Sequence, residues 1–181
     1  MERFVAFLRG MNLGNRRIKN PELAAEFDQL GFEEVATFRA SGNVVFATGE
    51  RESRAKLTER IEAGLIGGLG YDVPVYLRSA AEVAAIASHQ PFPARDVAAS
   101  KGKLQVTMLR GRPSAAAGKK ALAFSDDRDR LAIEGSELYW LPSGGVSESD
   151  LDLKAIERAL GPGTQRTMGT IEQIAAKYCA D

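Results

Sequence analysis

The residues with the clearest capacity for chemistry form a short polar cluster, Arg39, Ser41, Gly42 and Asn43, directly before an apolar segment at 44–48. Glycine takes positive φ without steric cost, and serine and asparagine side chains bond to nearby backbone, so the pattern predicts a tight turn between two strands. A turn does not need the arginine. Arg39 could donate two parallel hydrogen bonds to a carboxylate or phosphate, and its neighbours could add further donors. The cluster is therefore either a donor set for an anion or a hairpin turn with an arginine beside it.

A second candidate set lies in a loop of glycines, asparagines and arginines that spans 9–17. Arg9 and Asn12 could be ligand donors on this loop, or they could belong to a solvated loop with a surface ion pair. The loop has neither the Walker lysine pattern nor the Gly-x-Gly-x-x-Gly fingerprint, so neither established mode of nucleotide binding is indicated.

Arg166 is the third candidate, because it precedes the last predicted helix and a helix N-terminus beside an arginine favours an anion. Thr170 and Gln173 fit a capping box for that helix. We expect Arg166 to approach from the second half of the chain toward the other candidates, which converge at one end of the first sheet: Arg9, Asn12, Arg39, Ser41 and Asn43.

The residue types argue against a metal site or a cofactor, and neither is predicted. His89 is the single histidine and lies beside prolines, which disfavours histidine-dependent nucleophiles and clustered zinc sites. Cys179 is the single cysteine, so neither a disulfide framework nor a thiolate cluster is predicted. The charged run at 125–130 lacks the glycine and closing glutamate of a calcium loop and predicts a solvated turn.

Composition points to a soluble cytoplasmic protein without a membrane or nucleic-acid partner. The 24 lysines and arginines are balanced by 24 aspartates and glutamates, which argues against generic nucleic-acid binding. Tyr139 and Trp140 could stack a base, but neighbours on a strand point to opposite faces, so at most one faces a given surface. The apolar run at 4–8 is too short for a signal peptide or a membrane span. Oligomeric state is left open.

The elements that must position these residues follow from the hydrophobic pattern. In the first half we expect a strand at 3–8, a helix from Asn20-Pro21 to Gly31, strands at 35–38 and 44–48, a helix ending at Gly67-Gly68, and a strand at 73–77. Pro74 favours an edge position for that last strand. The apolar residues of 3–8 are consecutive rather than alternating, which predicts that both faces of the first strand are buried.

The second half repeats much of this order. Ser79 and Glu82 form a capping box for a helix through Ala87, and 89–103 is the predicted linker. A strand at 104–109, a helix at 114–124, a strand pair at 130–133 and 137–141, and a helix at 151–159 follow. The final helix stands where a last strand would be expected. The fold class is therefore α+β, with tandem ferredoxin-like (β-α-β-β-α-β) halves packed together at 1–78 and 104–181, joined by a helix and linker at 79–103.

The motif at 9–14 together with Ser41-Gly42-Asn43 resembles the bacterial family of proteins of unknown function DUF1697, which shows an Arg-Gly-Ile-Asn-Val-Gly loop and a Ser-Gly-Asn-Val-Val-Phe strand. The resemblance covers essentially the whole chain and implies tandem ferredoxin-like halves, with no settled activity to carry over. The family has a glycine where this chain has Asn15, a basic residue where it has Asp150, and asparagine and tryptophan where it has Thr167 and Met168. If the family binds an anion through that basic residue, this member binds it more weakly or binds another ligand.

Three functions fit these observations. The first is binding of a small anionic or phosphorylated ligand at the Arg, Ser and Asn cluster. The second is hydrolysis of a phosphoryl or acyl-phosphate group, with Arg9 clamping phosphate and Asn43 orienting water, although the acylphosphatase signature is absent. The third is an RNA-binding or protein-interaction module. The residue types leave open whether the protein is an enzyme.

Overall fold

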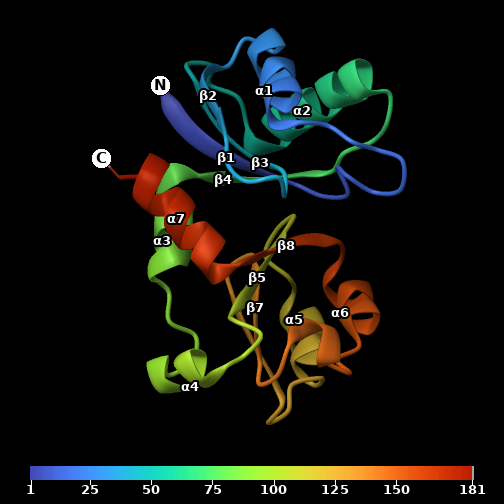
Figure 1. Ribbon diagram of the computed structural model, residues 1–181, viewed down its shortest axis with the longest axis vertical. Helices are drawn as coiled ribbons and strands as arrows, with labels where there is room; N and C mark the ends of the chain where they lie inside the picture. The colour runs from blue at the N-terminus through green and yellow to red at the C-terminus, as the bar shows by residue number, and fades with distance from the viewer. Residues whose placement is uncertain (181) are drawn as a thin grey trace. The chain divides into compact units, whose positions relative to one another are not determined.

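The first sheet is built from the N-terminal part of the chain. The computed structural model describes residues 1–180, which form two four-stranded antiparallel sheets and seven α-helices. The first six elements are β1 (Glu2–Leu8), α1 (Asn20–Gln29), β2 (Glu33–Thr37), β3 (Asn43–Thr48), α2 (Arg54–Leu69) and β4 (Val75–Ser79). The sheet order is β2-β3-β1-β4, with α1 and α2 on one face (Figure 1). The expected edge position of the strand after Pro74 is thereby confirmed.

Both faces of β1 are buried, as its consecutive apolar residues predicted. Phe4 and Leu8 belong to the core under α1 and α2, while Val5 and Phe7 on the opposite face have no exposed surface. Four phenylalanine rings, those of Phe4, Phe27, Phe32 and Phe46, pack in the core of this unit, and the closest pair has ring centres 4.4 Å apart. Aromatic rings bury a large apolar area each, so this core fixes β1 and β3 against the helices.

Helix boundaries differ slightly from the sequence expectations in this half. The N-cap of α1 is Lys19 rather than Asn20, and α2 continues past the two glycines to Leu69, with Gly70 as its C-cap. Gly70 adopts φ 78°, the left-handed conformation that commonly closes a helix. Gly67 and Gly68 can remain helical because a glycine inside a helix costs only about 1 kcal/mol relative to alanine.

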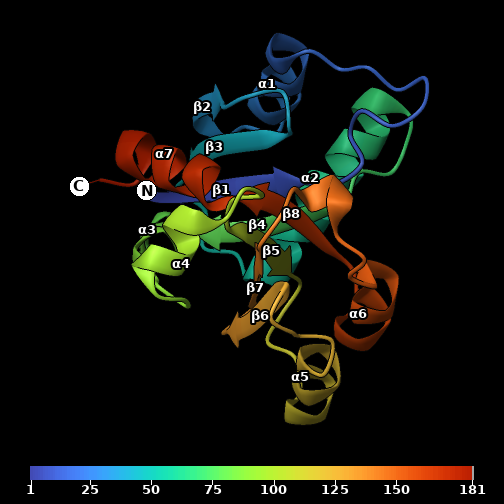
Figure 2. The same ribbon diagram turned by 60° about the horizontal axis from the view of Figure 1, so that its bottom comes forward.

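The second sheet has the same order of elements. It contains β5 (Gln105–Leu109), α5 (Ala115–Leu122), β6 (Asp129–Glu134), β7 (Glu137–Pro142), α6 (Leu153–Leu160) and β8 (Gly163–Thr167), with a short 3-10 helix at Val146–Glu148. The sheet order is β6-β7-β5-β8, which matches the first sheet strand for strand. Its core lies between the strands and the helices α5 and α6, seen in the lower right part of Figure 2.

The strand β8 corrects the expectation that a helix replaces the last strand. It pairs with β5 along its whole length, and α7 (Met168–Tyr178) follows it at once. The cap of α7 also lies three residues earlier than predicted, because Thr167 Oγ1 accepts from the backbone N–H of Thr170 at 3.3 Å. The strand was missed because Gly-Thr-Gln-Arg-Thr shows neither apolar alternation nor an apolar run.

The segment between the sheets is more ordered than the predicted linker. α3 (Ala80–Ser88) opens with the predicted capping box, in which Ser79 and Glu82 exchange hydrogen bonds of 2.8 and 3.2 Å. The stretch read as a linker contains the helix α4 (Ala94–Ala99), which is tied to β6 by the ion pair between Asp96 and Arg130.

Two compact units divide the chain. Met1–Ala85 forms one unit together with the C-terminal segment from Ile174 onward, and Ile86–Gln173 forms the other. From the sequence we expected one half at 1–78 and a second at 104–181, joined by a helix and linker at 79–103. That division assigned the C-terminal segment to the second half. Among residues 1–180, no helix is both long enough and apolar enough to cross a membrane.

Candidate functional site

The Arg39 to Asn43 segment is a tight turn between β2 and β3. The backbone N–H of Phe38 donates to Asn43 O at 2.9 Å, and Leu8 N–H donates to Gly42 O at 2.8 Å. Gly42 adopts φ 76°, and an added Cβ would lie 3.1 Å from the Cβ of Leu8. The turn therefore requires glycine both for its backbone conformation and for the close approach of β1.

Asn43 supports this turn from inside. Its side chain has no exposed surface, and its Nδ2 donates to Phe38 O at 2.7 Å and to Ser41 Oγ at 2.9 Å. An asparagine amide carries only two N–H donors, so both are engaged within the turn. Asn43 thus matches the structural alternative raised from the sequence, and it is not a source of N–H donors for a ligand.

The loop after β1 folds against the same turn. Asn12 Nδ2 donates to Ala40 O at 3.4 Å, and Asn12 Oδ1 accepts from the backbone N–H of Ile18 at 3.0 Å. Farther along, Tyr71 donates to Met11 O at 3.1 Å. These bonds hold a loop rich in arginine beside the turn, and they bring together two motifs that are 28 residues apart in sequence.

Two arginines accompany the turn and the loop. Arg39 is exposed, and its guanidinium carbon lies 5.6 Å from the centre of the Phe38 ring. Arg9 is half-buried and directly follows β1, where its backbone N–H donates to Pro74 O at 3.0 Å. The structure therefore gathers five of the six predicted site residues at the end of the first sheet where β1 leaves and β3 enters: Arg9, Asn12, Arg39, Ser41 and Asn43.

The backbone of Arg39 adopts φ 58°, a conformation that side chains other than glycine and asparagine rarely take. Left-handed residues of this kind cost of order 1 kcal/mol and cluster at functional sites. Turn chemistry alone would favour glycine or asparagine here, so the turn carries an arginine at an energetic cost.

Arg166 belongs to the other compact unit and lies on β8. It is buried, and its Nη1 donates to Thr164 Oγ1 at 2.9 Å and to Gln165 O at 2.8 Å. Burial disfavours the charged form and lowers the pKa of Arg166 to about 10. The expectation that Arg166 approaches Arg39 stays a prediction.

The first sheet carries a matching arginine that sequence reasoning missed. Arg78 on β4 pairs with Val5 of β1, and Arg166 on β8 pairs with Val106 of β5, so the two arginines occupy equivalent register positions. Arg78 is 3% exposed, and its Nη1 donates to the carbonyl of the preceding residue, Leu77, at 2.8 Å. Because each unit has its own such arginine, this arrangement favours a structural role for Arg166. The available signal was a single arginine within the apolar strand Val-Tyr-Leu-Arg.

The other aromatic and charged candidates contribute to the packing of the second unit. Tyr139 and Trp140 are both buried, so neither offers an exposed surface for base stacking, and the expectation that one might is not met. Trp140 Nε1 donates to Asp129 at 2.8 Å, which shows that the run at 125–130 is only partly a solvated turn. His89 lies against Tyr139, with ring centres 5.0 Å apart.

The comparisons with known proteins agree with this fold and assign no activity. A family model described as "Protein of unknown function (DUF1697)" matches residues 1–139, which include both the loop at 9–14 and the Ser-Gly-Asn turn. The solved structure of a conserved bacterial protein from Streptococcus pneumoniae resembles this chain with a TM-score of 0.74 and 20% identity, over 97% of each chain. At that identity the likeness shows a shared fold. No curated protein matches the chain.

Proposed function

The chain belongs to the DUF1697 family of proteins of unknown function, and we propose that it binds a small anionic or phosphorylated ligand at the end of its first sheet. The observation that carries this proposal is the exposed Arg39, whose backbone adopts φ 58°. The buried Asn43 side chain stabilises the turn that holds it, through a hydrogen bond to Phe38 O. A rigid turn that presents a guanidinium at an energetic cost fits the binding of an oxyanion better than it fits turn formation alone.

The roles divide between donors and supports. Arg9 and Arg39 supply the positive charge, and the Ser41 hydroxyl, whose oxygen already accepts from Asn43, keeps its own hydrogen for a ligand. Asn12 and Asn43 hold the loop and the turn. Each charge-assisted hydrogen bond would contribute roughly 1.5 to 3 kcal/mol to binding.

We further propose that each unit is a ferredoxin-like half. The order β-α-β-β-α-β occurs in both units, and the strand orders β2-β3-β1-β4 and β6-β7-β5-β8 are equivalent. This repeat supports a tandem architecture in which only the first unit carries the loop and turn motifs. The hydrolase alternative required Asn43 to orient a water molecule. This alternative is less well supported, because both amide hydrogens of Asn43 are engaged in the turn.

Thermal unfolding in the presence of phosphate, sulfate and a panel of phosphorylated metabolites tests ligand binding. A ligand at one hundred times its Kd stabilises the folded state by about 2.7 kcal/mol, which raises Tm by several degrees in a protein of this size. Arg39→Gly should abolish the rise while keeping the fold, and Arg51→Ala, an exposed arginine outside the cluster, should leave it unchanged. If no anion raises Tm, or if Arg39→Gly responds as the unaltered protein does, the proposed site is wrong.

A further inference from the structure

Arg16, in the loop between β1 and α1, is held on the surface by two contacts. Its guanidinium carbon lies over the ring of Tyr71, 4.4 Å from the ring centre, which is a favourable distance for a guanidinium against an aromatic face. Its backbone N–H donates to Leu13 O at 3.0 Å. The residue is exposed. Arg16 is therefore a positioned surface arginine, and it is not among the residues of the site proposed above.

Contacts of this loop connect Arg16 with the turn of the proposed site. Tyr71, which supports Arg16, donates to Met11 O at 3.1 Å. The next residue, Asn12, donates from Nδ2 to Ala40 O at 3.4 Å. Figures 1 and 2 show the loop after β1 beside the segment that joins α2 to β4, which carries Tyr71. All these residues belong to the first compact unit, so Arg16 and the turn lie at the same end of the first sheet.

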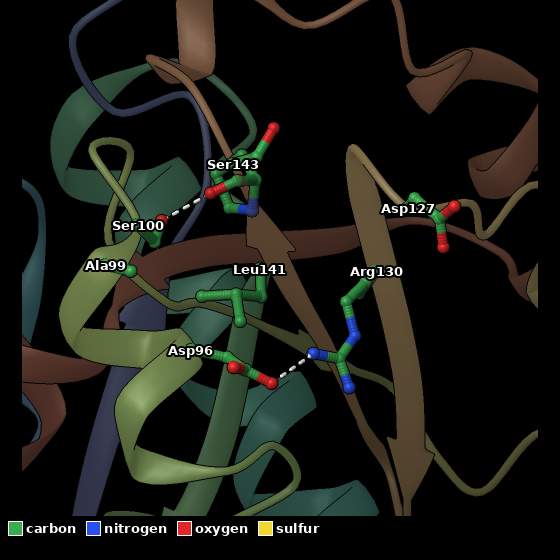
Figure 3. A pocket seen from close by; sticks show the side chains of 8 residues that line it. Asp96, Ala99, Ser100, Asp127, Arg130, Leu141 and Ser143 are labelled. Atoms are coloured by element: carbon green, nitrogen blue, oxygen red, sulfur yellow. Dashed lines mark hydrogen bonds and ion pairs between the residues drawn. The ribbon is translucent and has the colours of Figure 1, made fainter.

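Two other arginines that lie over an aromatic ring are paired with carboxylates, whereas Arg16 is not. In the pocket of the second unit drawn in Figure 3, Arg130 lies over Phe92, and its Nη1 donates to Asp96 Oδ2 at 2.7 Å. Arg60 in the first unit also lies over a ring and pairs with two glutamates. Within residues 1–180 the guanidinium of Arg16 forms no hydrogen bond and no ion pair. Its five N–H donors therefore remain available to a ligand.

The surroundings of Arg16 are positively charged. The segment 9–19 contains four cationic side chains and no carboxylate. Of the carboxylates nearest in sequence to this segment and to the supporting ring, Glu22 accepts from the backbone N–H of Lys19 at 2.9 Å. The other, Asp72, forms no ion pair with any residue in the part of the chain that the structure describes. An anion that approaches Arg16 therefore meets net attraction.

The rings that support Arg16 and Arg39 lie toward opposite edges of the first sheet. Arg39 lies over Phe38, which follows the edge strand β2. Arg16 lies over Tyr71, which precedes the other edge strand, β4. Neighbouring strands are about 4.8 Å apart, so three such intervals separate the two edge strands by about 14 Å. Supports this far apart favour a ligand whose anionic groups are also separated.

We infer that Arg16 binds a second anionic group, so that the ligand of this site carries two separated anionic groups, as a sugar bisphosphate does. The inference rests on the proposed function, in which Arg9 and Arg39 hold the first group. Contact with the Tyr71 ring keeps the Arg16 guanidinium in place before the ligand arrives, which reduces the conformational entropy lost on binding. The planar guanidinium fork suits an oxyanion in two-bond geometry.

Titration calorimetry of the full chain tests this inference with matched ligands at one fixed ionic strength, since salt screens exposed charges. Fructose 1,6-bisphosphate is compared with fructose 6-phosphate, and glucose 1,6-bisphosphate with glucose 6-phosphate. At least one bisphosphate should bind about tenfold more tightly than its matched monophosphate, which is the gain expected from one additional charge-assisted hydrogen bond. Pyrophosphate, whose phosphate groups share an oxygen, should gain less over phosphate.

Variants separate the role of Arg16 from that of charge alone. Arg16→Ala should lose the preference for the bisphosphate, while its affinity for the monophosphate stays that of the unaltered protein. Arg17→Ala is the matched control and should keep the preference. It removes the same charge from an exposed residue of the same loop that lies over no ring among residues 1–180. Arg16→Lys keeps the charge but loses the fork, and it should lose most of the preference.

Three results would overturn the role of Arg16 while leaving the site at Arg39 in place, because the monophosphates would still bind. The first is that no bisphosphate binds more tightly than its monophosphate. The second is that Arg16→Ala and Arg17→Ala reduce the preference equally. The third is that pyrophosphate gains as much over phosphate as the bisphosphates gain. If neither phosphate nor any phosphorylated sugar binds, the proposed function is wrong and this inference fails with it.

Discussion

Replacing Arg39 by glycine and by alanine tests whether its backbone is strained in the way that the proposed site requires. Both replacements remove the side chain and all its contacts, so their difference reports on the backbone alone. Relative to alanine, glycine relieves the left-handed conformation, which is worth about 1 to 2 kcal/mol. It also makes the unfolded chain more flexible, which costs about 0.4 to 1 kcal/mol. Arg39→Gly should therefore be more stable than Arg39→Ala by roughly 0.5 to 1 kcal/mol.

The neighbouring residue provides the matched control. Ala40 is also exposed, lies in the same turn and is not among the residues with positive φ. Ala40→Gly should therefore show the ordinary sign and destabilise the protein by about 0.4 to 1 kcal/mol. Urea unfolding followed by circular dichroism measures all three variants, provided that the slope of the transition is unchanged. An Arg39→Gly variant no more stable than Arg39→Ala would refute the strain, and with it the argument that the turn carries an arginine at a cost.

Two further substitutions test the supports of this site, and a third tests the capping box of α3. Gly42→Ala should destabilise the protein by at least about 1 kcal/mol, because the added Cβ meets Leu8 and the left-handed backbone disfavours alanine; urea unfolding measures it. Asn43→Ala should cost roughly 1 to 3 kcal/mol, because it removes two side-chain hydrogen bonds from a position with no exposed surface, and a loss below about 0.5 kcal/mol would contradict the geometry. Burial acts to raise the pKa of Glu82, but hydrogen bonds from the backbone of Ser79 and from an arginine outweigh it, so the folded-state pKa is lowered. A lowered carboxyl pKa stabilises the fold above the ordinary value of 4.5, and this contribution is lost as the pH falls through the folded-state value. The stability difference between the unaltered protein and Glu82→Gln should therefore shrink in acid unfolding experiments below pH 4.5, and a difference independent of pH would contradict it.

The sequence by itself determined the features that depend on local interactions. The capping box at Ser79, the turn at Gly42 and the buried strand at 4–8 follow from side chains within a few residues of one another, or from a run of apolar residues. Their physical causes are short-range hydrogen bonding, backbone freedom at glycine and the burial of apolar surface. For the same reason, the order of elements in the first half was predictable almost completely.

The tertiary structure alone decided the features that depend on partners distant in sequence. β8 forms because β5 offers a row of backbone hydrogen-bond groups, although its own side chains carry no strand pattern. The equivalent positions of Arg78 and Arg166 follow from strand register, which no local pattern records. The engagement of both Asn43 donors, and the joining of the loop at Asn12 to the turn at Ala40, likewise depend on chain folding. Residue types could therefore identify the candidate site. Only the folded chain showed that Asn43 stabilises the turn while Arg39 remains exposed.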